Sequence, residues 1–148
     1  MIIGIVSGYF NPLHQGHIEY INGAKIRCEY LIAIINNDAQ VRLKGSVSFM
    51  DEIHRQTIVC NLRSVDSVVL SIDDDSSVCK TIELIKSLRK ENELIFFNSG
   101  DRVSDNVDNR EVVLCNKLGI KYVTLPLPKR YSSNELIRNA ANKIFVKD

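Results

Sequence analysis

The sequence lacks any marked excess of charge. Its 148 residues include 19 Lys and Arg and 18 Asp and Glu, for a formal charge of +1, and residues of one sign do not gather in a block. A protein that binds the backbone of a nucleic acid normally presents a strongly basic face, because every phosphate that it contacts is negative. Nucleic acid is therefore not expected as the main partner.

Closely spaced pairs of cysteines are also absent. The four cysteines lie far apart in the sequence, at Cys28, Cys60, Cys79 and Cys115, without a C-x-x-C pair. Disulfide frameworks belong mainly to short secreted chains, and zinc sites need ligands at closer spacing. We therefore expect reduced cysteines in the core and no metal-ligating residues.

Long hydrophobic runs are missing as well. Residues 31–35 form a run far too short to span a membrane, and residues 1–6 are too few for the core of a signal peptide. We expect a cytoplasmic protein with no membrane partner. Since a domain usually has about 100 to 200 residues, residues 1–148 are predicted to form a single domain around one core.

Apolar runs rich in β-branched residues recur along the chain and are typical of strands buried on both faces of a parallel sheet. They occupy residues 2–6, 31–35, 65–72, 94–97 and 122–125. Between them, apolar residues recur at helical spacing over residues 18–24, 53–62, 78–88 and 112–118, and again after Ser133. This alternation predicts an α/β fold with a doubly wound sheet of about five parallel strands flanked by helices.

Ligands of such sheets bind beyond the carboxyl ends of the strands, at the point where the strand order reverses. The residues that follow each strand are therefore the candidates for function. One such stretch, residues 73–77, contains three aspartates followed by two serines. We expect it to form a solvated loop with a helix N-cap.

The stretch after the first strand carries the strongest functional signal. It reads S-G-Y-F-N-P-L-H-Q-G-H over residues 7–17 and leads directly into a helical pattern. Gly8 permits a sharp turn, Pro12 stiffens the loop, and Gly16 permits close backbone approach where the helix begins. The amides of that helix terminus form an anion site, which both His14 and His17 can face. This loop is therefore predicted to bind an anionic ligand.

This segment resembles the G-x-F-x-P-x-H-x-G-H signature of the cytidylyltransferase-like nucleotidyltransferases, whose fold is Rossmann-like. Other stretches extend the resemblance over nearly the whole chain. Residues 36–38 and 42–45 resemble the flexible lysine loop of the family, and residues 99–101 its G-D element. Arg55 is similar to an arginine of the family, and residues 63–66 are similar to the R-x-V-D stretch of glycerol-3-phosphate cytidylyltransferases. Residues 130–134 are similar to the family's serine element before the last helix.

The resemblance implies an enzyme in which a substrate phosphate attacks the α-phosphate of a nucleoside triphosphate and pyrophosphate leaves. His14 and His17 would contact the triphosphate and stabilise the transition state, while Lys44 closes over the phosphates. Arg130, Ser132 and Ser133 would hold the β- and γ-phosphates. The implied cofactor is Mg²⁺, which would bridge the phosphates through water without a cage of carboxylates.

Further residues are implied in nucleotide binding by their place in the matching motifs. Gly100 and Asp101 would lie against the ribose or the base, and Arg63 would help to seat the base. The remaining positions belong to the loop after the first strand: Gly8, Tyr9, Phe10, Asn11 and Gly16.

Several positions depart from the family pattern. Tyr9 stands where many members have Thr, Ser or Cys, and its ring is bulky enough to crowd or stack on the phosphate loop. Asn11 replaces the commoner Asp, and residues 98–101 read N-S-G-D in place of the K-G-G-D of heptose-phosphate adenylyltransferases. These departures leave the reaction class unchanged and bear on the substrate.

Two kinds of nucleotide remain open. The R-S-V-D stretch at residues 63–66 favours CTP and transfer of CMP to a small phosphorylated alcohol or sugar, which we prefer. ATP is the alternative, because residues 37–38, 42–45 and 73–75 resemble heptose-1-phosphate adenylyltransferases. Residues 132–138 also resemble adenylyltransferases that act on pantetheine phosphate or nicotinate mononucleotide.

The sequence also bears on two other classes of protein and on a zinc site. A nucleotide-binding module without turnover would need a broken signature, and both histidines, the lysine and the serines are present. A fragment of a class I aminoacyl-tRNA synthetase would need tRNA-binding appendages, for which 148 residues leave no room. Zinc would need a full set of ligands around His14 and His17, but the only other histidine is His54, and we expect no nearby Cys or carboxylate to complete the set.

The apolar residues on the helices permit a homodimer without requiring it.

Overall fold

The computed structural model describes residues 1–99, 109–127 and 133–145. Strands and helices alternate through these residues, as the apolar pattern predicted. The elements are β1 (Ile2–Gly8), α1 (Gln15–Lys25), β2 (Tyr30–Ile35), α2 (Asp38–Lys44), α3 (Glu52–Cys60), β3 (Ser67–Leu70), α4 (Cys79–Leu88), β4 (Glu93–Ser99), α5 (Asn109–Leu118), β5 (Lys121–Leu125) and α6 (Ser133–Phe145).

The strands form one parallel sheet in the order β3-β2-β1-β4-β5, which confirms the predicted fold class. The chain first moves outward from β1 to β3 and then returns to place β4 on the other side of β1. The strand order therefore reverses between β1 and β4. In a doubly wound sheet, this point at the carboxyl ends of the strands is where a ligand binds.

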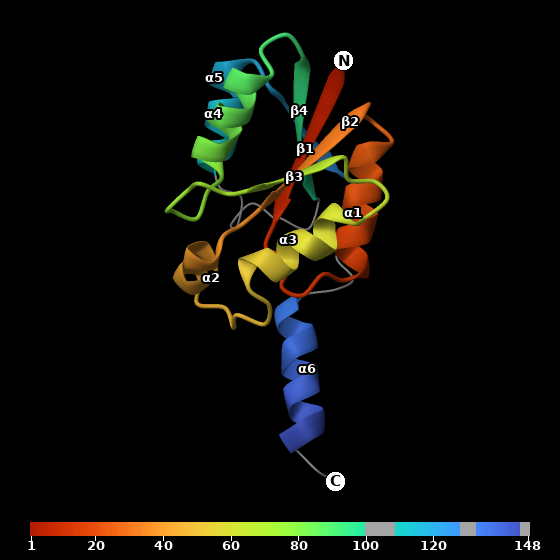
Figure 1. Cartoon of the computed structure of the whole chain (residues 1–148), viewed down its shortest axis with the longest axis vertical. Helices are drawn as coiled ribbons and strands as arrows, with labels where there is room; N and C mark the ends of the chain where they lie inside the picture. Colours follow the sequence, from red (N-terminus) through yellow and green to blue (C-terminus); the bar gives the residue numbers. More distant parts are fainter. Residues whose placement is uncertain (100–108, 128–132, 146–148) are drawn as a thin grey trace.

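Helices cover both faces of the sheet (Figure 1), because successive strand side chains point to opposite faces. In β2, Leu31, Ala33 and Ile35 share a core with α1 and α3, whereas Ile32 and Ile34 share a core with α4 and α5. This two-sided burial explains the continuous apolar run in the sequence.

The edge strands β3 and β5 are less buried than the three central strands. The apolar run at residues 65–72 predicted a longer strand than the one observed, Ser67–Leu70. Its pairing with β2 extends from Ser67 to Leu70, and the chain then turns into the acidic stretch. At the edge of a sheet, pairing on one side alone favours such short strands.

The cysteines are all reduced, as expected, but they are not all in the core. Cys115 is buried, and burial is the main reason that the pKa of its thiol rises to about 12. Cys28 and Cys79 are half-buried. The prediction is wrong for Cys60, which is exposed at the end of α3, where the buried side chain is that of Val59.

The last helix, α6, extends away from the body of the molecule (Figure 1). Its apolar side chains Leu136 and Ile144 are exposed. None of the helices in the described part of the chain is long and apolar enough to cross a membrane.

Candidate active site

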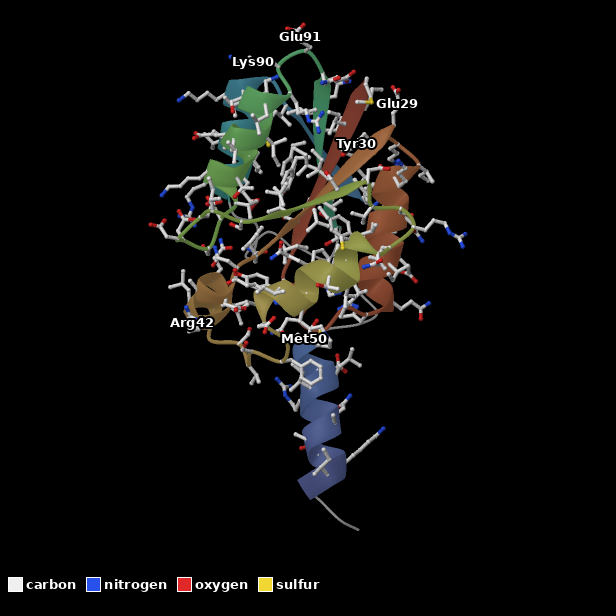
Figure 2. The ribbon with its side chains drawn as sticks, viewed as in Figure 1. Glu29, Tyr30, Arg42, Met50, Lys90 and Glu91 are labelled. Carbon is white, nitrogen blue, oxygen red and sulfur yellow. The ribbon has the colours of Figure 1, made fainter. Side chains whose placement is uncertain are left out.

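The candidate site lies at the carboxyl ends of β1, β2 and β4, where residues 9–14 lead from β1 into α1. In Figure 1 this is the end of the molecule from which α6 extends. Figure 2 labels Arg42 and Met50 toward this end, and Glu29, Tyr30 and Lys90 toward the opposite one. We call these the carboxyl end and the amino end of the sheet.

Phe10 shapes the loop between β1 and α1. Its φ of 50° lies in the left-handed region, and its side chain is buried. The ring lies edge-on to the ring of His17, with centroids 4.9 Å apart. It also covers Gly8 so closely that a Cβ there would lie 3.0 Å from the ring Cζ. The sharp turn expected at Gly8 therefore falls on Phe10, and Gly8 is needed for space.

Both histidines take part in starting α1. His14 is the N-cap residue, and its Nδ1 accepts a hydrogen bond from the Gly16 amide at 3.1 Å. The Nδ1 of His17 in turn accepts from the amide of His14 at 3.1 Å, which completes a capping box made of two imidazoles. A nitrogen that accepts a hydrogen bond carries no proton, so each neutral ring holds its proton on Nε2.

The two imidazole rings of His14 and His17 stack, with centroids 3.7 Å apart and 22° between their planes. Neutral rings can lie this close without electrostatic repulsion, and each is a hydrogen-bond donor through Nε2. The amides of Gly16, His17 and Ile18 already donate to His14, so the first turn of α1 contributes the positive end of the helix dipole beside the two rings. The two Nε2 donors and this dipole together suit phosphate oxygens.

Asn11 joins the loop to the segment between α2 and α3. Its buried side chain donates from Nδ2 to the Val47 carbonyl at 2.7 Å. Its Oδ1 accepts from the amides of Phe49 and Met50, both at 3.0 Å. The resemblance implied nucleotide binding for Asn11; in the structure its amide group holds the backbone of residues 47–50 beside the loop.

Arg55 binds several backbone segments of the carboxyl end together. Its side chain is 0% exposed, and its Nη1 donates to the carbonyls of Tyr9 at 2.8 Å and Asn36 at 2.6 Å. Its Nε donates to the Met50 carbonyl at 3.0 Å, and its Nη2 forms an ion pair with Asp38 at 2.9 Å. The family resemblance pointed to Arg55, but the sequence alone did not reveal that its guanidinium is buried.

Lys44 lies beside the loop, at the end of α2. Its Nζ is 4.4 Å from the centroid of the Tyr9 ring. The sequence placed Lys44 in a flexible loop, and this prediction is wrong. Asn37 caps the start of α2 and Gly45, with φ 76°, closes its end, so a short helix forms although it buries few apolar side chains.

The acidic stretch after β3 is partly buried, which corrects the expectation of a solvated loop. Asp73 is 3% exposed, and its carboxylate accepts from the amides of Lys80 at 2.7 Å and Thr81 at 3.1 Å. Asp73 therefore accepts from amides of the first turn of α4, which the N-cap residue Val78 cannot do because it has no side-chain acceptor.

Side-chain amides from the start of α2 hold this acidic stretch in place. Asn37 donates from Nδ2 to the carbonyls of Ser71 and Asp73, and Gln40 donates from Nε2 to those of Asp75 and Ser77. These bonds fix the loop after β3 against α2, beside the site.

Ser133 connects the last helix to the loop. Its Oγ donates to the Pro12 carbonyl at 2.7 Å, which places the first residue of α6 beside the loop between β1 and α1. The other residues implied at this part of the site, Gly100, Asp101, Arg130 and Ser132, lie outside the described residues.

Arg63 is not brought to the site. It is exposed in the turn between α3 and β3. Its neighbour Ser64 bonds to Asn22 in the second half of α1, and Asp66 bonds to Lys25 and to the Leu31 amide at the start of β2. Arg63 therefore lies toward the amino end of the sheet, which argues against the role in seating the base that the resemblance implied.

A buried amide lies at the end of β4, in the strand next to β1. Asn98 is 3% exposed, and its Oδ1 has no hydrogen-bond partner among the described residues. Strand alternation puts its side chain on the face of Leu94 and Phe96, which pack toward α4 and α5. Buried oxygens of this kind normally have a partner, so Asn98 is an exception in this end of the sheet.

No group of three or more His, Cys, Asp and Glu side chains in the described part of the chain could hold a metal ion. The loop between β1 and α1 instead brings together the two imidazoles of His14 and His17, with the exposed ammonium group of Lys44 beside it. Such a set is suited to binding a polyanion.

Comparisons with known proteins agree with this geometry. The family model described as cytidylyltransferase-like matches residues 5–139. A "Bifunctional protein HldE" from Caulobacter vibrioides is 35% identical over 137 residues, which cover 91% of this chain and 26% of that protein. A protein of the same name from Rhodopseudomonas palustris is 30% identical, with 95% and 27% covered. The chain thus spans about a quarter of these curated relatives.

Solved structures resemble the fold. A lipopolysaccharide core biosynthesis protein from Thermoplasma volcanium has a TM-score of 0.70 and 27% identity, and the match covers 89% of this chain and 99% of the other. A bifunctional NMN adenylyltransferase/ADP ribose pyrophosphatase from Francisella tularensis, 15% identical, has a TM-score of 0.64, with 95% and 42% covered; this likeness shows the fold alone. The family match, the sheet order and the H-x-G-H loop lead to one conclusion: the chain belongs to the cytidylyltransferase-like family of nucleotidyltransferases.

Proposed function

We propose that this chain transfers a nucleoside monophosphate from a nucleoside triphosphate to a small phosphorylated substrate and releases pyrophosphate. The observation that carries the proposal is the pair of neutral imidazoles at the start of α1, each with Nδ1 held by a backbone amide. A structural cap needs only an acceptor atom, which Ser or Asp supplies more simply. Two stacked imidazoles add two Nε2–H donors at an anion-binding helix terminus.

The reaction is an in-line displacement. An oxygen of the acceptor phosphate attacks the α-phosphorus, the bond from that phosphorus to the bridging oxygen breaks, and pyrophosphate leaves with that oxygen. The acceptor phosphate is already an anionic nucleophile, so the protein must position two polyanions and stabilise their charge. His14 and His17 donate from Nε2 to phosphate oxygens, and Lys44 supplies a positive charge beside them.

Magnesium belongs to the proposal as a cofactor that is bound mainly by the triphosphate and water. Mg²⁺ commonly keeps several waters and few protein ligands, and the described residues contain no cage of carboxylates. When bound, the ion neutralises charge on the phosphates of the nucleotide.

The nucleotide that we propose is ATP, with a sugar phosphate as the acceptor. The sequence favoured CTP through the R-S-V-D stretch, but Arg63 and Asp66 lie toward the amino end of the sheet, and Asp66 is bonded to Lys25. That stretch therefore gives no support for a cytosine site. The relatives named HldE match the branch that the sequence offered as its ATP-dependent alternative, and a solved neighbour is named for lipopolysaccharide core biosynthesis.

The test is pyrophosphate release by the purified protein with Mg²⁺, each of the four common nucleoside triphosphates, and a panel of sugar and alcohol phosphates. We expect release with ATP and a sugar phosphate, and a nucleotide-linked product by mass spectrometry. Release with CTP and an alcohol phosphate would keep the reaction class and overturn the choice of substrate. Absence of release throughout the panel would count against the enzyme.

Substitution of one histidine tests the assigned site. His17→Ala should fold and lose about 10²- to 10³-fold in turnover, because it removes one donor to the phosphates. His54→Ala is the matched control, since His54 is exposed on α3 and outside the loop. Equal turnover in the two folded variants would overturn the role of His17.

A further inference from the structure

Tyr9 departs from the family pattern at a position in the loop itself. Its backbone is fixed, because its carbonyl accepts from the buried guanidinium of Arg55 at 2.8 Å. Its ring therefore leaves the chain from a rigid point. The Nζ of Lys44 lies 4.4 Å from the centroid of that ring, within the range of a cation–π interaction.

Lys44 lies at the very end of its helix. It is exposed, and it is the last residue of α2, after which Gly45 turns the chain away in the left-handed region. A lysine ammonium on a flexible stem samples many positions in water. The electron-rich face of an aromatic ring narrows those positions to the ones beside the ring.

We propose that Tyr9 is a positioning residue, which holds the Lys44 ammonium beside the phosphate-binding loop before the nucleotide arrives. The inference rests on the proposed function, and it adds a residue that the chemistry of the loop does not itself require. A cation over a ring face keeps its outer side open, so the ammonium can donate to a phosphate oxygen without leaving the ring. Preorganisation of this kind lowers the entropy lost when the charge meets the transition state.

The expected effect is modest and specific. An exposed cation–π contact corresponds to about a two- to fivefold effect. Tyr9→Thr, which restores a residue common in the family, should lower kcat/KM by about that factor. Tyr9→Phe keeps the ring face and should retain more activity than Tyr9→Thr.

A double-mutant cycle with Lys44→Met separates positioning from a general disturbance of the loop. In the Lys44→Met background, Tyr9→Thr should have no further effect on kcat/KM, because there is no ammonium left to position. An undiminished loss in that background would overturn the proposal and assign Tyr9 a direct or structural role instead. A gain of activity in Tyr9→Thr would mean that the ring crowds the site, and would overturn it too.

A second measurement needs no turnover. Lysine side chains can be dimethylated with ¹³C-labelled methyl groups, which keeps their charge, and Lys44→Arg assigns the signal of Lys44. A methyl group over an aromatic ring is shifted upfield by the ring current. That shift should be present in the unliganded protein, remain in Tyr9→Phe and vanish in Tyr9→Thr.

The two readouts distinguish the failure of this inference from the failure of the proposed function. If the unaltered protein releases no pyrophosphate with any substrate while the ring-current shift is present, the contact stands and its catalytic purpose falls. If the unaltered protein turns over but Lys44 shows no such shift and the cycle shows no coupling, the inference falls and the proposed function stands.

Discussion

One ion pair from each end of the sheet can be compared, and the two are built differently. At the carboxyl end, Arg55 is 0% exposed, its partner Asp38 is 25% exposed, and Arg55 also bonds to three backbone carbonyls. At the amino end, Lys25 and Asp66 are 2.6 Å apart, but their side chains are 30% and 33% exposed. In the first pair the arginine is buried and joins several chain segments, whereas both partners of the second pair lie at the surface.

The difference concerns where buried polar side chains lie in this fold. Burying a charged or polar side chain is unfavourable unless its donors and acceptors are satisfied. Arg55, Asn11 and Asp73 at the carboxyl end are buried, and their hydrogen bonds hold backbone segments together.

The largest expected effect is at Arg55. Arg55→Met should lower the free energy of unfolding by about 3–5 kcal/mol, because it leaves Asp38 and three carbonyls without their donor. Urea unfolding measures this. Arg63→Met is the control, since Arg63 is exposed toward the amino end, and it should stay within about 0.5 kcal/mol. Similar losses in the two variants would show that the two ends of the sheet do not differ in this way.

A pair of asparagines gives the next largest effect. Asn11→Ala removes three hydrogen bonds to residues 47–50 and should lower the free energy of unfolding by about 2 kcal/mol. Asn22→Ala removes one exposed bond with Ser64, so it should lower it by less than about 1 kcal/mol. Thermal and urea unfolding of the two variants side by side would decide; a larger loss for Asn22→Ala would contradict the comparison.

The effect expected at Asn98 has the opposite sign. Its buried Oδ1 has no partner within the described part of the chain, so Asn98→Leu should raise the free energy of unfolding by about 1 kcal/mol. Asn98→Asp should lower it, because it would place a charge at the same buried position. A stabilised Asp variant would show that the position is more hydrated than its 3% exposure indicates.

The smallest effect is at the amino end and depends on pH. Burial raises the pKa of Asp66, but the hydrogen bonds from Lys25 and Leu31 and the charge of Lys25 outweigh it, so the pKa lies below the ordinary 3.8. The folded pKa is thus below the unfolded one. The stabilisation is therefore present above the unfolded pKa and is lost as pH falls through the folded pKa.

For this exposed pair the magnitude at neutral pH is below about 1 kcal/mol. Asp66→Asn should therefore unfold slightly more easily than the unaltered protein at pH 7, and the difference should shrink as the solution is acidified below pH 4. A difference that grows on acidification would show that the sign of the pKa shift is wrong.

The sequence predicted the alternation of strands and helices because central parallel strands bury both faces, and their apolar runs are unmistakable. It also located the loop at residues 7–17, where glycine, proline and histidine occur at a spacing with a local physical meaning. Helix α2 was missed because its stability comes from Asn37 and Gly45 at its two ends. Capping depends on geometry that an apolar pattern does not contain.

Long-range hydrogen bonds account for the other differences. Asp73 was expected in solvent, and its burial depends on amides of α4 and on Asn37, which is 36 residues away. Arg55 and Arg63 looked alike in sequence, and the turn of the chain between α3 and β3 separates them into a buried junction and an exposed side chain. Such partners become visible only when the chain has folded.

Helix α6 meets the loop through Ser133 and then extends from the body (Figure 1). With 13 residues it is about 20 Å long. If the helix tilted by about 10° about the contact with the Pro12 carbonyl, its far end would move by about 3 Å. A spectroscopic label at exposed Ile144 would therefore report such a tilt from a position far from the loop between β1 and α1.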